Sequence, residues 1–231
     1  MLLGIETTQS ETQVGLAGDA GVVASRTIPG PRNHVEALVP AILGLLADRG
    51  MELGDVARIA VDRGPGLFTS LRVGVATAKT LAHALGVPVA GVCSLDVLAW
   101  AARETGGAVC ACLDARRGQV FAALYRDGAR EGEIRVLDPD ALARELRPGT
   151  ILAGDGAQAY PDALGGWPVA FAGAPPVEGV LALATEFRGA TALEPLYVRR
   201  SEAEINWEER GVVIERPSRV KIPKRALEGR A

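Results

Sequence analysis

A glycine-rich turn followed by a long helical pattern, over residues 64–86, constrains the fold more than any other stretch of the chain. The Gly-Pro-Gly turn ends the apolar run 58–62, because proline removes a strand hydrogen-bond donor and glycine loosens the backbone. Apolar residues then recur at steps of four, three, four and three, at Leu71, Val75, Ala78, Ala82 and Leu85. This spacing predicts one face of a helix, capped by Thr69 or Ser70 and stopped at Gly86.

A second row of this predicted helix carries only small side chains, at Ser70, Gly74 and Ala78. A small-residue row lets another backbone approach closely, and a glycine inside a helix costs about 1 kcal/mol unless packing requires it. Three interpretations follow: an anion site at the helix N-terminus, a surface for another protein, or a tight turn before a well-packed helix. A P-loop is excluded, because no Gly-Lys-Ser/Thr ending follows the glycines and Lys79 lies more than two turns into the helix.

Eight positions of this stretch form a longer motif: Gly64, Pro65, Gly66, Phe68, Thr69, Leu71, Arg72 and Gly74. The motif resembles the signature of the TsaB (YeaZ) family, whose members belong to the bacterial machinery that makes threonylcarbamoyladenosine in tRNA. It departs from the family pattern at Leu67, where serine is usual, and at Ser70, where glycine is usual. Segments 113–121 and 195–199 also look like TsaB elements, so the resemblance covers roughly residues 1–200.

The resemblance implies a non-catalytic dimerisation subunit rather than an enzyme. In the family, the paralogue TsaD transfers the threonylcarbamoyl group to N6 of the adenosine 3′ of the anticodon, in tRNAs that read codons beginning with A. TsaB-like chains pair with TsaD through a four-helix interface, and the ATPase TsaE docks on the pair. By this resemblance we expect a TsaD-like and a TsaE-like partner, tRNA bound through the complex, and a homodimer when the partner is absent.

Two predicted helices supply the candidate partner surface. The first, residues 33–47, has apolar side chains on more sides than one buried face requires, and the second follows the Gly-Pro-Gly turn. We predict contacts at His34, Leu38, Val39, Ile42, Leu45, Leu71, Gly74, Val75, Ala78 and Ala82. An exposed patch of this kind is a liability on a monomer. Ile42→Asp or Ala78→Glu is then expected to abolish pairing and leave the fold largely intact.

Possible nucleotide contacts lie at the end of the first strand and in the turn: Glu6, Thr7, Thr8, Gly64 and Gly66. The first three stand where actin-like ATPases contact phosphates with an acid followed by small polar residues. Glu6 replaces the family's aspartate and is longer by one methylene. The sequence therefore predicts no tightly bound cofactor, although ATP or ADP at the junction with the partner is compatible with it. An autonomous ATPase or small-molecule kinase of this fold is the alternative function.

Other chemistry finds little support in the sequence. Neither His34 nor His83 has a second ligand at metal spacing, and no Gly-x-Ser-x-Gly elbow occurs, so we expect no metal site and no catalytic residue. A peptidase is disfavoured for the same reason. We interpret the three cysteines, at positions 93, 110 and 112, as buried structural residues. A net charge of −3 argues against a large nucleic-acid surface on this chain alone. The absence of a long apolar run argues against the membrane and for the cytoplasm.

The order of predicted elements indicates an actin-like, Hsp70-like ATPase fold of the α/β class, with mixed sheets flanked by helices. Three short strands are followed by a helix, a strand, the helix of the signature and another strand. We predict an N-terminal lobe over residues 1–103, a smaller α/β lobe over 104–190, closed by a helix from 177 to 187, and a C-terminal segment 191–231. Its basic stretch 216–225 is either a solvated terminus or a contact for RNA.

Overall fold

The structure is a computed structural model of the chain, and it describes residues 1–30 and 34–199, with only the backbone of residues 34 and 35. Residues 1–198 form one compact unit. The predicted basic stretch 216–225 and most of the predicted segment 191–231 lie outside the described residues. The predicted lobe boundaries stay a prediction. In the described part of the chain, no helix is both long and apolar enough to cross a membrane.

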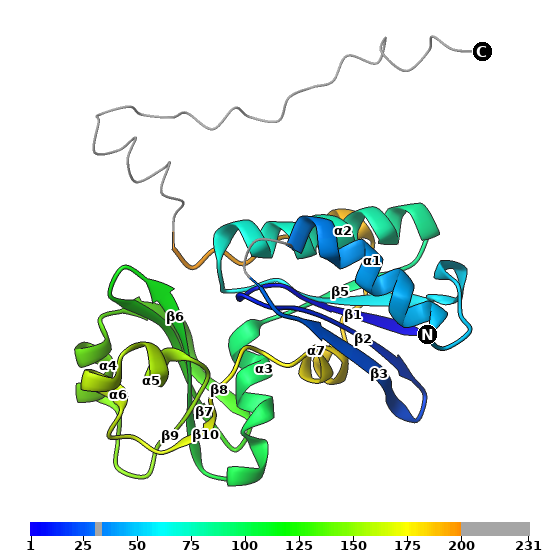
Figure 1. Ribbon diagram of the computed structural model, residues 1–231. Coiled ribbons are helices and arrows are strands. Elements are labelled where there is room, and N and C mark those ends of the chain that lie inside the picture. The colour runs from blue at the N-terminus through cyan, green and yellow to red at the C-terminus, as the bar shows by residue number, and fades with distance from the viewer. Residues whose placement is uncertain (31–33, 200–231) are drawn as a thin grey trace, which may run out of the picture. The chain divides into compact units, whose positions relative to one another are not determined.

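Two five-stranded sheets form the framework (Figure 1), and both have the same strand order. The first has the order β3-β2-β1-β4-β5, in which β1 is antiparallel to β2 and parallel to β4. Its strands are β1 (Leu2–Glu6), β2 (Thr12–Gly18), β3 (Gly21–Ile28), β4 (Arg58–Asp62) and β5 (Val89–Val92).

The second sheet repeats this arrangement with the order β8-β7-β6-β9-β10. Its strands are β6 (Ala108–Arg116), β7 (Gln119–Arg126), β8 (Ala129–Leu137), β9 (Ile151–Ala153) and β10 (Val169–Phe171). Here β6 is antiparallel to β7 and parallel to β9, as β1 is to β2 and β4. The duplicated mixed sheet confirms the predicted two-lobed actin-like fold.

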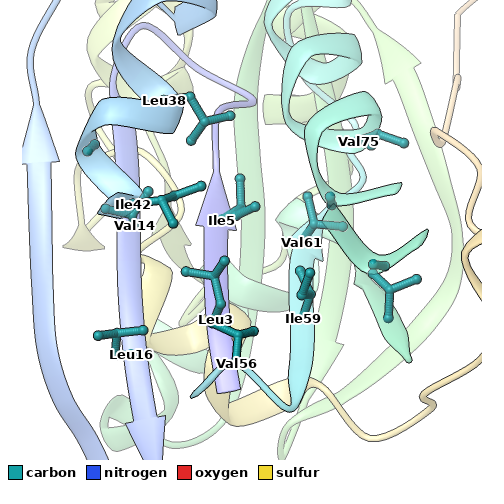
Figure 2. Packing of buried hydrophobic residues seen from close by; sticks show 14 of the residues in the cluster. Leu3, Ile5, Val14, Leu16, Leu38, Ile42, Val56, Ile59, Val61 and Val75 are labelled. Atoms are coloured by element: carbon teal, nitrogen blue, oxygen red, sulfur yellow. The ribbon is translucent and has the colours of Figure 1, made fainter. Parts of the chain in front are cut away.

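Helices α1 (His34–Ala47) and α2 (Phe68–Leu85) cover one face of the first sheet. Alternate residues of β1 and β2 point to this face, where Leu3, Ile5 and Val14 join Leu38 and Ile42 of α1 in one core (Figure 2). The C-terminus of α2 is confirmed, because Gly86 adopts the left-handed conformation with a φ of 68°. The predicted cap is wrong: α2 already begins at Phe68, and Leu67 takes the cap position without a side-chain hydrogen bond.

Helix α7 (Val177–Leu183) lies on the opposite face of the first sheet, although the sequence predicted it as the close of the second lobe. Gly4 and Gly15, which are paired in register, leave the space that Leu181 fills; a Cβ at either glycine would lie 2.8 or 2.9 Å from its side chain. The chain therefore returns to the first sheet after completing the second, and the order of elements alone does not reveal this return.

Helix α3 (Ser94–Ala101) joins the two sheets, because its Leu95 and Leu98 pack on the second sheet while Val97 packs with α7. The remaining described helices are α4 (Pro139–Glu145), α5 (Gly156–Ala159), α6 (Pro161–Leu164) and three short 3-10 turns, η1 (Leu53–Asp55), η2 (Arg103–Thr105) and η3 (Ala190–Ala192). Cys110 and Cys112 are buried and free in the core beneath α4, as expected for structural cysteines.

Candidate functional site

The Gly-Pro-Gly turn is locked onto the hairpin between β1 and β2. The Leu67 amide donates to the Thr8 carbonyl oxygen at 2.7 Å, and a Cβ at Gly66 would overlap that same oxygen. The Thr7 hydroxyl donates to the Ser70 carbonyl at 2.8 Å, and a Cβ at Gly74 would overlap the Thr7 hydroxyl oxygen. The small residues of the signature therefore serve close packing between α2 and the end of β1.

Two carboxyl groups meet at the ends of neighbouring parallel strands. Glu6 and Asp62 each follow the register pair Ile5 and Val61 by one residue, and both are buried. Glu6 Oε1 accepts hydrogen bonds from the Thr8 amide and hydroxyl, both at 2.6 Å. The sequence reasoning singled out Glu6 but missed Asp62, although both are acids that directly follow a buried apolar strand.

Gly64 and Ser94 hold the carboxylate of Asp62 in place. Its Oδ1 accepts from the Gly64 amide at 2.8 Å and from the Ser94 hydroxyl at 2.7 Å. The second oxygens of Glu6 and Asp62 are buried, and neither has a hydrogen-bond donor among the described residues. A proton on Glu6 turns that carboxyl into a donor to Asp62, so a single shared proton satisfies both oxygens.

The environment favours this shared proton. Burial raises the pKa of the Glu6 carboxyl well above its ordinary value, and the charge of Asp62 raises it further. Burial also raises the pKa of Asp62, although the hydrogen bonds from the facing Glu6, Gly64 and Ser94 oppose the shift. The pair is a buried acid dyad that ties the ends of β1 and β4 to the start of α3.

Most polar groups of the predicted nucleotide contacts are engaged within this chain. Glu6, Thr7 and Thr8 are buried, and their polar side-chain groups bond to one another or to the signature turn. The Gly64 amide is used by Asp62, and Gly66 packs against Thr8. An anion at this place would meet two buried acidic side chains, Glu6 and Asp62. The turn is thus a packed turn in this structure, and nucleotide contact at these five residues stays a prediction.

The predicted partner contacts are mostly core residues of this chain. Those with buried side chains or backbones are Leu38, Ile42, Leu45, Leu71, Gly74, Val75, Ala78 and Ala82. Val39 is exposed, and the side chain of His34 lies outside the described residues. Helical periodicity found the apolar face that packs on the chain's own sheet. Ile42→Asp and Ala78→Glu are therefore expected to unfold the protein rather than test pairing.

A different face of the same two helices is open. On α1, Val39 and Leu43 are 42% and 47% exposed, and Pro40 and Ala47 lie exposed on the same side. On the neighbouring α2, the exposed residues of the corresponding row are Ala76, Thr80 and Ala84. We call these seven residues the open helical face. It consists of six apolar residues and Thr80, and none of the seven is charged.

Another cluster of side chains lies at the N-terminus of α2. Arg72 Nε donates to the Tyr197 hydroxyl at 2.7 Å, and the Arg72 guanidinium stands 3.8 Å from the centre of the Phe68 ring. The sequence reasoning placed these residues in two separate TsaB-like segments and did not connect them. That both segments resemble the same family was the signal for their proximity.

The fold and these motifs agree with comparisons to known proteins. Residues 19–150 match the family model of TsaD, described as tRNA N6-adenosine threonylcarbamoyltransferase. The tRNA threonylcarbamoyladenosine biosynthesis protein TsaB of Bacillus subtilis is 32% identical over 224 residues, which cover 89% of this chain and 97% of that protein. This chain belongs to the TsaB (YeaZ) family.

Other TsaB relatives agree with this assignment. TsaB of Escherichia coli is 34% identical over 171 residues, covering 70% of this chain and 74% of that protein. The solved structure of YeaZ from Pseudomonas aeruginosa has a TM-score of 0.73 at 31% identity, covering 85% of this chain and 98% of that one. The family assignment therefore rests on relatives and a solved structure that each cover 70% or more of this chain.

Proposed function

We propose that this chain is the non-catalytic dimerisation subunit of a tRNA threonylcarbamoyl transferase. It pairs with a TsaD-like chain, which transfers the threonylcarbamoyl group to N6 of the adenosine 3′ of the anticodon, and a TsaE-like ATPase docks on the pair. Membership of the TsaB family supports this role, and so does the match of residues 19–150 to the TsaD family model, which suggests that two related folds pair.

The observation that carries the pairing is the open helical face. Val39 and Leu43 are nearly half exposed although both are large and apolar, and the α2 row beside them is made of Ala76, Thr80 and Ala84. Small side chains let two helices from a partner approach closely, and burial of apolar surface contributes about 25 cal/mol per Å². We propose that the same face also mediates self-association when the partner is absent.

The acid dyad supports a subunit rather than an autonomous kinase. A kinase requires donors for phosphate or carboxylates open to a metal ion, whereas Glu6 and Asp62 face each other and are closed off by Thr8 and Ser94. Nucleotide at the junction with the partner stays compatible with this proposal, because other residues would hold it there.

The test is a pair of matched substitutions. Leu43→Asp places a charge on the open helical face, and Val22→Asp makes the same kind of change at a 45%-exposed position on the edge strand β3. Each is titrated calorimetrically with the TsaD-like chain from the same organism. We expect Leu43→Asp to weaken binding at least 30-fold, equivalent to about 2 kcal/mol at a hot spot, and Val22→Asp to change it little. Equal binding by both variants, with both folded, would place the interface elsewhere.

A further inference from the structure

Three side chains from two distant segments form a cluster at the N-terminus of α2. We call Phe68, Arg72 and Tyr197 the aromatic platform. The two rings stand 5.2 Å apart between centres at an angle of 34°, and the Arg72 guanidinium lies 3.8 Å from the Phe68 ring centre and 5.6 Å from that of Tyr197. The hydrogen bond from Arg72 Nε to the Tyr197 hydroxyl fixes the three groups relative to one another.

The platform is exposed and its charge is not neutralised. Phe68 is 37% and Tyr197 44% exposed. Within the described part of the chain, Arg72 forms no ion pair and its side chain has no hydrogen bond other than the one to Tyr197. Two aromatic rings and a planar cation are therefore exposed to solvent together. A ligand that covered them would remove apolar surface from water.

A cavity of about 890 Å³ continues from the platform, with Tyr197 and Arg63 in its lining. The Arg63 side chain lies across Gly91, where a Cβ would stand 2.7 Å from its Cδ. Hydrogen bonding of the Leu196 amide to the Arg63 carbonyl, at 2.7 Å, holds Arg63 next to Tyr197. Among the described residues, the Arg63 guanidinium has no ion-pair or hydrogen-bond partner.

Two of the three carboxylates of the cavity lining are paired with arginines other than Arg63. Asp96 is paired with Arg130 at 3.3 Å, and Glu186 with Arg188 at 2.8 Å. Glu133 is the remaining acid of the lining. Two unpaired guanidinium groups, Arg63 and Arg72, therefore flank Tyr197 on a chain whose net charge is −3.

We propose that the aromatic platform binds an unpaired base of the tRNA, with Arg72 and Arg63 on the adjoining phosphates. Unstacked bases are recognised by aromatic rings and guanidinium planes, and unpaired arginines bind phosphate oxygens. The cavity offers space for a nucleoside beside Tyr197. This inference rests on the proposed function, which makes tRNA the substrate of the complex.

The experiment measures binding of a fluorescein-labelled, unmodified tRNA transcript to the assembled complex with the TsaD-like chain, by fluorescence anisotropy. Phe68→Ala removes one stacking face, and we expect tRNA affinity to fall about 5- to 150-fold. Arg72→Ala is expected to weaken binding and to reduce the slope of log affinity against log salt by about one. Tyr197→Phe keeps the ring and loses the bond to Arg72, so its effect is expected to be smaller than that of Phe68→Ala.

The control is Arg144→Ala, which removes an equal charge from the exposed side of α4 and is expected to leave tRNA affinity unchanged. Light scattering on every variant reports pairing with the TsaD-like chain separately. Unchanged tRNA affinity in the Phe68 and Arg72 variants would overturn the inference. So would loss of pairing in these variants, because the platform would then be a protein contact. If the wild-type chain itself does not pair, the proposed function fails instead.

Discussion

Glu6→Gln should stabilise the protein increasingly as the pH rises. In the substituted chain, the amide oxygen can accept the bonds from Thr8, and the amide nitrogen can donate to Asp62 permanently. The wild-type dyad needs a proton for that contact, and burial raises the pKa of Glu6 well above its ordinary value. Because the raised pKa belongs to the folded state, its contribution to stability is fully present below the ordinary pKa of glutamate and is lost as the pH rises toward the raised value.

The expected pH dependence of the free energy of unfolding follows from the titration of a single proton. Each pH unit between the ordinary and the raised pKa of Glu6 removes about 1.4 kcal/mol from the free energy of unfolding of the wild type. The difference between Glu6→Gln and the wild type should therefore grow by about 1.4 kcal/mol for each pH unit over which the pH lies between the ordinary and the raised pKa. Glu6 is completely buried, so solvent screening does not reduce this figure.

The assay is urea unfolding followed by circular dichroism at half-unit steps from pH 5 to pH 8. Glu194→Gln, which neutralises an exposed carboxyl, is the control and should shift the curve by less than about 0.5 kcal/mol at every pH. A constant difference between Glu6→Gln and the wild type over this range would refute the shared proton. A large loss of stability at every pH would show that the amide cannot replace the carboxyl in this site.

Two further predictions concern packing and the thiols. Gly66→Ala should lower the free energy of unfolding by about 1–3 kcal/mol, because its Cβ would overlap the Thr8 carbonyl; Gly54→Ala, which meets open space, should have little effect, and equal melting temperatures for the two variants would contradict the close approach. Burial raises the pKa of the Cys93 and Cys110 thiols to about 12, so neither should react with a thiol-specific disulfide reagent at pH 8 until urea is added; rapid reaction of the folded chain would contradict their burial.

The sequence predicted the topology well because turn residues and apolar periodicity act locally. The Gly-Pro-Gly turn and Gly86 bound α2 at both ends, and the order of strands and helices indicated the duplicated fold. The end of α2 is confirmed as predicted, whereas its start was misplaced by the two hydroxyl residues. Thr69 and Ser70 look like caps, but the backbone already turns helical at Phe68.

The candidate surfaces were harder to predict, since a core and an interface are both apolar. Leu38 and Ile42 fit the helical spacing of α1 as well as any partner contact would, and only the position of the first sheet shows that they face inward. Val39 and Leu43, on the other side of α1, are equally apolar, but the described residues leave them 42% and 47% exposed. The return of α7 to the first sheet could not be predicted for a related reason. Helix periodicity shows that a helix has an apolar face, but it does not show which sheet that face covers.

The acid dyad could have been predicted from the sequence. Glu6 and Asp62 each end an apolar strand, and the ends of neighbouring parallel strands meet at one edge of a sheet. What the sequence could not supply was that both carboxyls are closed off from solvent. That closure depends on Thr8, on Ser94 and on the packed signature turn.

The molar mass of the purified chain by light scattering, alone and mixed with the TsaD-like chain from the same organism, tests the central claim most directly. The account predicts a self-dimer that exchanges into a one-to-one complex with the TsaD-like chain. A monomer whose mass does not change when that chain is added would contradict it.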